Sequence, residues 1–546
     1  MAKTLRFALM HSWRDQIMLG LAIALVALIF MPLVPGLFWT MSPAFHLSVW
    51  QTLWLDPQWR QALLATVLSA SIGTTLAFLF AITMAKQLYP GRRWLQLRQR
   101  LPILLAIPHA AFAIGFFFLV APSGWLSRLV ALLSGWVMPP NWITVQDSYG
   151  LSLALALAIK ESWFLLWVLF AVLSEQEITR QMTLGQTLGY SRTQVWRTIL
   201  LPQILPRMGW PLAAVLAYGL SVVDMALILG PTNPPTLAVL IWQWLTNPDE
   251  KLQAQGSAAS LLLLGLLLMM VALIRFVWQQ GLFFRRYPLG ERFPKQRSRV
   301  PWLNLLFFGV GYVVIFLLLL WSLAGGWFYP AIWPETITLT SWLQADFAPF
   351  KTSLWLGFAV CFLCLPLVLF WLEWGPQKLN ALLYLPLIVP ALPLMAGQYS
   401  ALLHLHLDGS ATGLIWSHLL WVLPCMLLTL VGPYRAFDRR IMTTAQALGI
   451  SRFMACLRVK WPMLLRPIMA ALAIGFAVSI AQYLPTLFAG GGRFDTVTTE
   501  AVALSAGGNR RILAVQALLQ ILLPLMAFAC AAALPTWLFR HRKGLH

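Results

Sequence analysis

Twelve apolar runs, each close to 20 residues long, recur along the whole chain. A helix of that length crosses the ~30 Å hydrocarbon core of a bilayer. The composition agrees, because 60% of the residues are hydrophobic and only 10% are charged, whereas soluble domains carry about 25% charged residues. The pattern excludes soluble globular, disordered and fibrous proteins, and it predicts an all-α polytopic membrane protein. The expected spans are 16–38, 61–85, 101–121, 149–173, 209–230, 257–278, 302–324, 352–372, 381–401, 413–433, 467–489 and 511–535.

The formal charge of +21 follows the predicted topology. With both termini placed in the cytoplasm, thirty of the 38 Lys and Arg residues fall in inside segments, seven fall in outside loops, and Lys160 lies within a span. This distribution obeys the positive-inside rule. The basic character therefore indicates a lipid bilayer as the partner and gives no reason to expect nucleic-acid binding.

The chain contains two copies of one six-span unit in the same orientation. Residues 182–192 repeat as residues 442–452 at a constant offset of 260. Further pairs are Pro108 with Pro390, Gly115 with Gly397, Ser221 with Ser479, and Asp224 with Gln482. Parallel repeats of this kind are typical of transporters. We therefore expect a first half at 1–285, a basic cytoplasmic linker at 286–300, and a second half at 301–546.

The strongest repeat lies in an inside loop between the fourth and fifth spans of each half. Gly189 and Gly449 allow the turn that ends a short helix, and Ser191 and Ser451 are good N-caps for the next one. Pro202 and Pro462 are expected to break the path before it re-enters the membrane. The pattern predicts a short exposed helix under the bilayer in each half. The candidate loop residues are Gly185, Gln186, Leu188, Gly189, Ser191, Arg192, Ile199 and Pro202, with Ala445, Gln446, Leu448, Gly449, Ser451, Arg452, Val459 and Pro462.

The spacing of this loop resembles the EAA loop of ATP-binding-cassette (ABC) importer permeases. That pattern is E-A-A, three residues, G, nine residues, I, any residue, then L-P, and the first copy matches it at Gly189, Ile199 and Pro202. The chain departs from it at Thr183 and Thr443, which replace the glutamate in each copy. The likeness covers nearly the whole chain, as two fused halves, and it is closest to the iron(III)- and thiamine-type permeases.

This resemblance implies a type I importer fold in a bacterial inner membrane. It also implies two copies of a cytoplasmic ATPase docked on the loops, a periplasmic substrate-binding protein, and a translocation path for a small solute such as iron(III) or thiamine. The sequence contains no G-x-x-x-x-G-K-[ST] loop to cradle phosphates. We therefore expect ATP to be bound by the separate subunit, with no cofactor, metal or catalytic residue in this chain.

Three ionisable residues within the spans are further candidates, because such groups are costly in the bilayer. Lys160 and Glu161 lie in the fourth span, and Asp224 lies in the fifth. They either form a buried bridge between Lys160 and Asp224, or they line the path with Glu161 facing the space between the halves. The candidate path residues are Lys160, Glu161, Ser221, Asp224, Ser479 and Gln482.

Two other functions agree with the same spans. A secondary transporter of 6 + 6 architecture would couple to an ion gradient through the buried charges. A polytopic membrane enzyme would need a carboxylate or metal cluster near one membrane face, and the sequence shows none. The loop itself could instead be a basic amphipathic segment lying on anionic lipid, although its presence in both halves favours docking.

Overall fold

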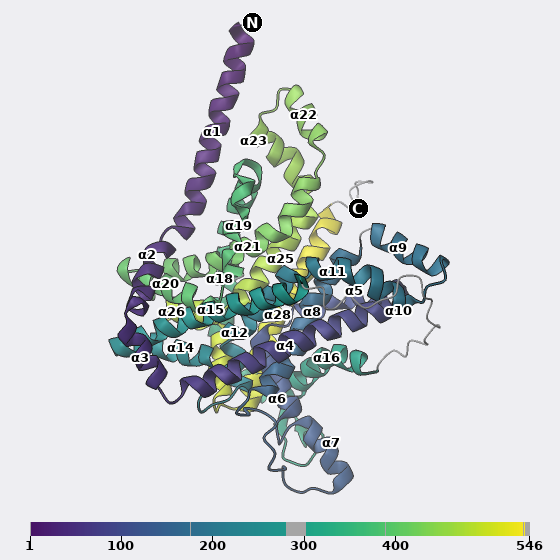
Figure 1. Cartoon of the computed structure of the whole chain (residues 1–546), viewed down its shortest axis with the longest axis vertical. Coiled ribbons are helices and arrows are strands. Elements are labelled where there is room, and N and C mark those ends of the chain that lie inside the picture. Colours follow the sequence, from purple (N-terminus) through teal and green to yellow (C-terminus); the bar gives the residue numbers. More distant parts are fainter. Residues whose placement is uncertain (1, 175, 280–301, 388, 539, 541–546) are drawn as a thin grey trace.

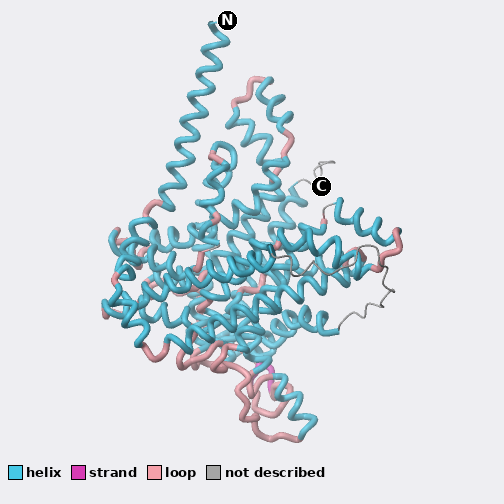
Figure 2. Tube along the Cα trace, viewed as in Figure 1, coloured by secondary structure: helices cyan, strands magenta, loops and turns pink. Residues whose placement is uncertain are grey.

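The structure is a computed structural model that describes the chain except residues 1, 175, 280–301, 388, 539 and 541–546. The predicted linker at 286–300 lies outside these described residues. Helices form nearly all of the rest (Figures 1 and 2). The first half contains α1 (Ala2–Phe30), α2 (Leu33–Met41), the 3-10 helix η1 (Ser42–Phe45), α3 (Leu47–Leu55), α4 (Trp59–Leu88), α5 (Arg92–Leu105), α6 (His109–Val120), α7 (Trp125–Ser134), α8 (Leu151–Leu173), α9 (Gln176–Thr187), α10 (Arg192–Val195), the π-helix η2 (Trp196–Leu200), α11 (Leu201–Arg207), α12 (Gly209–Ser221), α13 (Asp224–Leu229), α14 (Leu237–Leu245) and α15 (Glu250–Gln279).

The second half repeats much of this order. It contains α16 (Trp302–Leu323), the short antiparallel strands β1 (Ala324–Gly326) and β2 (Thr336–Ile337), α17 (Thr340–Gln344), α18 (Ala348–Trp374), η3 (Gln377–Leu379), α19 (Asn380–Leu383), η4 (Leu385–Leu387), α20 (Ala391–His404), α21 (Ala411–Ala436), α22 (Arg439–Ala447), α23 (Arg452–Ala455), the π-helix η5 (Cys456–Lys460), α24 (Trp461–Met463), α25 (Leu465–Ala481), α26 (Leu484–Gly490), α27 (Val497–Ser505) and α28 (Arg510–Leu538).

The membrane prediction is confirmed. Over the described residues, eight helices are long and apolar enough to cross a bilayer, and three bent helix pairs raise the number to as many as eleven. A shorter apolar helix, Phe307–Leu323, is also present. Together these segments overlap each of the twelve predicted spans, and the molecule is an all-α polytopic membrane protein.

The third predicted span, 101–121, is wrong as a continuous helix. The chain breaks between α5 and α6, where Pro108 precedes the first residue of α6. Helix α5 is amphipathic: Trp94, Leu97 and Leu101 are buried, whereas its arginines are exposed. A helix with one charged face lies along a surface more readily than it crosses hydrocarbon.

The fifth predicted span of each half is also interrupted. In the first half α12 ends at Ser221 and α13 begins at Asp224, and in the second α25 ends at Ala481 and α26 begins at Leu484. The two breaks fall at equivalent positions in the repeat. Broken helices at membrane depth are tolerated where the freed backbone is covered by protein or lines a cavity, which makes this level of the fold a candidate for the path.

The first helix of each half packs against the other half. Helix α1 contacts α18 and α21, and α2 lies along α20. In exchange, α16 packs on α6 and α8 as well as on α28 of its own half. The hydrophobic clusters show the same exchange, since Val26 belongs to a cluster made mainly of second-half residues and Val314 to a larger one made mainly of first-half residues.

This exchange explains the repeated glycine of the third span. A Cβ added at Gly115 would lie 2.4 Å from Cγ1 of Val314 on α16. A Cβ at the equivalent Gly397 would lie 2.8 Å from Leu37 on α2. In each half the glycine therefore leaves room for a helix of the other half to cross closely.

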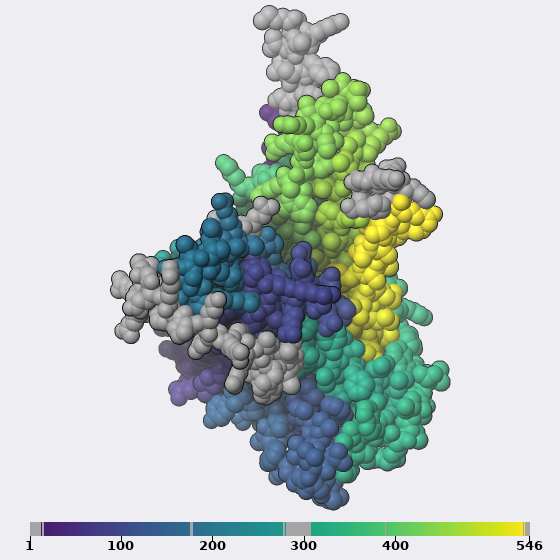
Figure 3. All heavy atoms as spheres, turned by 90° about the vertical axis from the view of Figure 1, so that its right-hand side faces the viewer, coloured from purple at the N-terminus to yellow at the C-terminus, as the bar shows by residue number. Residues whose placement is uncertain are grey.

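The inside loops of the two halves lie away from the end of the molecule that carries α7. Figure 3 shows the segments that contain α9 and α22, together with the C-terminal part of α28, above the α7 segment on this side of the molecule. Helix α7 extends from the opposite end of the bundle (Figure 1). The loop residues and the α6–α7 region therefore lie at different ends of the helical bundle.

Candidate functional site

The two loops have the same backbone conformation. Gly189 has φ +87° and Gly449 has φ +85°, in the left-handed region that glycine adopts without strain. The N–H of Tyr190 donates to the carbonyl of Gly185 at 3.1 Å, and that of Gly189 donates to Gln186 at 3.1 Å. These two bonds form a Schellman motif, which satisfies the last carbonyls of α9.

The second loop repeats the motif at the predicted residues. The N–H of Ile450 donates to the carbonyl of Ala445 at 3.3 Å, and that of Gly449 donates to Gln446 at 2.9 Å. The sequence prediction of a short helix ended by glycine therefore holds in both copies. Gly185, Gln186, Ala445 and Gln446 supply the backbone acceptors that close each helix.

The two serines cap the helices that follow. Ser191 accepts a hydrogen bond from the N–H of Gln194 at 3.3 Å, and Ser451 accepts one from Met454 at 3.4 Å. After one turn each helix widens into a π-helix, in which Leu201 donates to Trp196 and Trp461 donates to Cys456. Single π-turns of this kind occur frequently at functional sites.

The expectation that Pro202 and Pro462 break the path is wrong. Each proline lies just after the π-turn within a continuous helical path, Arg192–Arg207 in the first loop and Arg452–Met463 in the second. The bends come later: α10–α11 meets α12 at 57°, and α23–α24 meets α25 at 81°. Ile199 and Val459 are half-buried within the π-turns.

Exposure follows the same pattern in both short helices. Leu188 is 60% exposed and Leu448 is 78% exposed, whereas Gly185 and Ala445 are buried. A Cβ at Gly185 would lie 2.6 Å from Cγ2 of Val195. The position equivalent to Val195 in the second loop is the fully buried Ala455. A Gly and a Val in one loop thus correspond to an Ala and an Ala in the other.

An arginine fastens each loop to the end of the second span of its half. Arg192 donates from Nη2 to the carbonyls of Gln87, at 3.0 Å, and Tyr89, at the end of α4. Arg452 donates in the same way to the carbonyl of Glu373 near the end of α18, at 3.0 Å. Both predicted arginines therefore hold the loop against the bundle and do not point outward to a partner.

The second loop has an additional buried ion cluster. The Glu373 carboxylate, 7% exposed, accepts from Arg452 Nε at 2.9 Å, Lys460 Nζ at 2.7 Å and the Tyr434 hydroxyl at 2.7 Å. A hollow of about 660 Å³ opens beside this cluster and is also lined by Gln446 of α22. The cluster joins α18, α21 and η5 directly beneath the exposed loop.

Two buried acids of the first half, Glu161 and Asp224, lie near His109 at the start of α6. Its Nε2 lies 2.9 Å from Oε1 of the buried Glu161. Its ring packs at a tilt against Tyr218, with the ring centroids 4.6 Å apart. The buried Asp224 is close enough for its charge to interact with that of His109. Ser221 sits at the break beside them and donates to the carbonyl of Ala217.

The structure does not form the expected pair between Lys160 and Asp224. Lys160 Nζ donates instead to the carbonyl of Leu104 at 3.4 Å and lies 5.2 Å from the ring centroid of Trp163. Adjacent residues on a helix point in directions about 100° apart. Lys160 therefore faces α5, whereas Glu161 faces α6 and meets His109.

The second half has a neutral network at the corresponding level. His418 is fully buried, and its ring nitrogens lie 2.9 Å from Ser479 Oγ and 3.0 Å from Thr486 Oγ1. Thr486 donates in turn to the carbonyl of Gln482 at 2.9 Å. Both ring nitrogens of His418 are therefore hydrogen-bonded, one to Ser479 and the other to Thr486. Of the two predicted path residues, Ser479 contacts the histidine directly and Gln482 is linked to it through Thr486.

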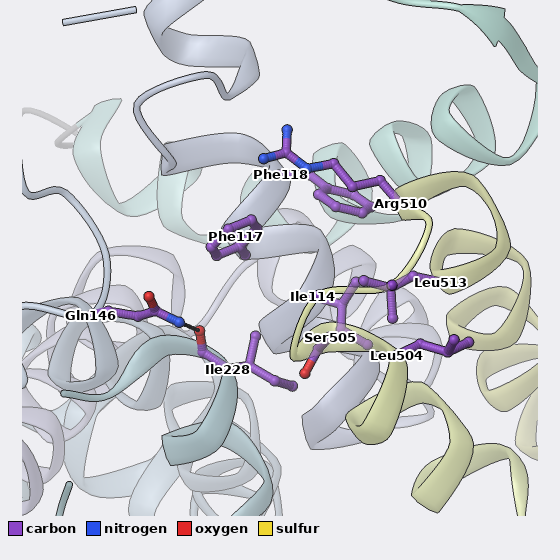
Figure 4. A pocket seen from close by; sticks show the side chains of 11 residues that line it. Ile114, Phe117, Phe118, Gln146, Ile228, Leu504, Ser505, Arg510 and Leu513 are labelled. Atoms are coloured by element: carbon purple, nitrogen blue, oxygen red, sulfur yellow. Dashed lines mark hydrogen bonds between the residues drawn. The ribbon is translucent and has the colours of Figure 1, made fainter. Parts of the chain in front are cut away.

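A cavity of about 300 Å³ lies between the halves, close to the C-terminal end of α13. Figure 4 shows Gln146 and Ile228 of the first half on one side of it, with Leu504 and Ser505 of the second half opposite. Next to Gln146, Asp147 caps α8. Burial acts to raise the pKa of Asp147, but hydrogen bonds from Ser152 and Leu151 outweigh it and hold that pKa below its usual value.

Several of these residues were not predicted from the sequence. His109 directly follows Pro108, which the repeat had already singled out. Glu373 could have been found by extending the repeat, because Pro90 and Pro376 align at an offset of 286 and place Glu373 opposite Gln87.

Comparison with known proteins identifies the family. No family model matches the chain. The inner membrane ABC transporter permease protein YnjC of Escherichia coli (strain K12) is 44% identical over 546 residues, which cover the full length of both proteins. With this identity over its entire length, the chain belongs to the permease proteins of ABC transporters.

Proposed function

We propose that the chain is the membrane-spanning permease of an ABC importer in a bacterial inner membrane. The observation that carries this proposal is the duplicated loop, in which two segments 260 residues apart share a left-handed glycine, a serine cap and a π-turn. Two equivalent exposed loops suit two copies of an ATPase. ATP itself would be bound by those subunits.

The proposed mechanism is alternating access. The ATPase subunits would move the loops as they close on ATP, and the π-turns would pass this motion to the fifth spans through α12 and α25. A ligand shifts such an equilibrium only by its differential affinity for the two states. The arginine anchors at Arg192 and Arg452 would move the second spans together with the loops.

The solute is proposed to cross between the halves, near the breaks of the fifth spans. The polar groups that flank these breaks are His109, Glu161 and Asp224 in the first half, and Ser479 and Gln482 in the second. A periplasmic binding protein would deliver the solute. The resemblance to fused permeases makes iron(III) and thiamine the first candidates to assay, in free or complexed form.

Purification from membranes of the native host tests the ATPase partnership. A tagged permease should retain an ABC ATPase at two copies per chain, measured by quantitative mass spectrometry. Gly189→Arg and Gly449→Arg should insert normally and uncouple ATP hydrolysis from transport, because a large side chain at a left-handed position distorts the docking helix. If the purified chain transports solute on an ion gradient without any ATPase, the proposal fails and the secondary-transporter alternative is correct.

A further inference from the structure

The cavity between the halves has one cationic side chain at its edge. Arg510, at the start of α28, lines the cavity together with Phe117 and Phe118 of α6. Its guanidinium lies 5.8 Å from the ring centroid of Phe117 and donates from Nη1 to Ser123 Oγ at 3.1 Å. Within the described residues, no carboxylate oxygen lies within 4.0 Å of it.

Two neighbouring arginines, Arg128 and Arg511, differ from Arg510 because their guanidinium groups donate to backbone carbonyls. Arg128 donates to the carbonyls of Ser123, Phe328 and Ala331, at 2.6 to 3.1 Å. Arg511 donates to the carbonyl of Gly325. A guanidinium has five N–H donors, so Arg510, with one hydrogen bond to a side chain, retains donors for a further acceptor.

The opposite side of the cavity holds a residue in a rare backbone conformation. Gln146 has φ +57°, one of two non-glycine residues with positive φ in the described chain. Its backbone N–H donates to the carbonyl of Leu229 at 3.0 Å, and its side-chain amide reaches the carbonyl of Ile228 at 3.5 Å (Figure 4). Strained residues of this kind are concentrated at ligand sites.

No acidic side chain of the described residues lines the cavity. Asp147 accepts from the N–H groups of Leu151 and Ser152, at 2.7 and 2.9 Å, at the start of α8. Asp224 lies at the far end of α13 from Ile228, about 6 Å away along the helix axis. Neither side chain lines the cavity, and Arg510 is the one ionisable side chain among its lining residues.

We propose that this cavity receives a solute with an anionic group, a carboxylate, sulfate or phosphate, attached to an apolar body. Arg510 binds the anion through charge-assisted hydrogen bonds, and Phe117, Phe118 and Ile228 contact the apolar part. The inference rests on the proposed import function and narrows its substrate class. A free cation, such as thiamine or uncomplexed iron(III), has the wrong charge for this cavity.

Thiol labelling tests the charge preference directly. Ser505→Cys is introduced together with Cys530→Ser, which removes the exposed native cysteine. The purified chain is treated with an anionic and a cationic methanethiosulfonate of similar size, and the anion-to-cation rate ratio is divided by that of free cysteine. A nearby positive charge should raise this ratio about tenfold, and Arg510→Gln should return it to about one.

Arg60→Gln is the matched control, because Arg60 belongs to the same predicted outside surface but does not line the cavity. The elevated ratio should survive this change. Benzoate should slow labelling by the anionic reagent, and benzyltrimethylammonium should not. Leu504→Cys serves as a second reporter if Ser505→Cys folds poorly.

A normalised ratio near one in the chain with native Arg510, or a raised ratio that Arg510→Gln leaves unchanged, overturns the proposal. So does failure of both reporter cysteines to react with either reagent. The rates need no ATPase. A failed charge preference therefore leaves the ABC assignment standing, and a failed co-purification leaves the charge preference measurable.

Discussion

In the first half the loop is fastened through backbone carbonyls of Gln87 and Tyr89, whereas in the second half it is fastened through the buried carboxylate of Glu373 as well. The loop backbones are nonetheless alike, down to the glycine φ values and the π-turns. The comparison teaches that glycine and serine set the shape of the loop locally. The contacts that hold it to the bundle can differ without changing that shape.

The largest expected effect distinguishes the two anchors. Glu373→Ala removes the carboxylate that pairs Arg452 and Lys460. The Lys460 side chain, 12% exposed, is then left without its counter-charge, and breaking a buried pair typically costs about 3–5 kcal/mol. The free energy of unfolding in detergent should fall by about that amount. Gln87→Ala is the matched change in the first half and should have a much smaller effect, because Arg192 binds the backbone carbonyl that remains. Equal losses for both variants would show that the anchors do not differ in the way described.

The second prediction compares the interiors of the halves. His418→Leu leaves the hydroxyls of Ser479 and Thr486 without their histidine partner, which should lower the stability by about 1–3 kcal/mol. His109→Gln keeps a donor near Glu161, so stability should change less and transport more. Thermal unfolding and a transport assay on both variants check this. The reverse pattern, with His418 controlling transport, would place the path in the second half.

These interiors also show what the sequence could and could not predict. The repeat, the spans, the turn glycines and the serine caps could be predicted because they depend on residues close together in the chain. The pairing of Lys160 with Asp224 is absent from this structure, because depth in the bilayer does not determine which face of a helix meets which neighbour. The crossing of α16 over Gly115 is a contact between helices far apart in sequence, so local pattern carries no signal of it.

The third prediction converts one loop into the other. Gly185→Ala should destabilise the first loop by about 1–2 kcal/mol, because its Cβ meets Val195. Val195→Ala alone should cost a similar amount by opening a cavity. The double variant reproduces the pair Ala445 and Ala455 of the second loop, so it should be more stable than the sum of the single effects predicts. Strict additivity, with coupling below about 0.5 kcal/mol, would show that the side chains at positions 185 and 195 do not interact.

The smallest expected effect tests the shared backbone. Gly189→Ala and Gly449→Ala each place a Cβ at φ near +86°, which costs about 1 kcal/mol. No atom lies within 4 Å of a Cβ built at Gly449, so its cost is conformational alone. Unfolding measurements should give similar losses for both variants. Clearly unequal losses of unfolding free energy would mean that one loop relaxes around the added Cβ in a way that the other cannot.

The central claim is that both loops dock on equivalent ATPase subunits. A photocrosslinking amino acid placed at Leu188 or at Leu448, the exposed leucines of the two short helices, tests it in native membranes. Leu133 on α7, which is 88% exposed at the other end of the molecule, is the control. We expect both loop positions, and not Leu133, to crosslink to the same ATPase with similar yield. Crosslinking at only one loop, or at neither, would contradict the account.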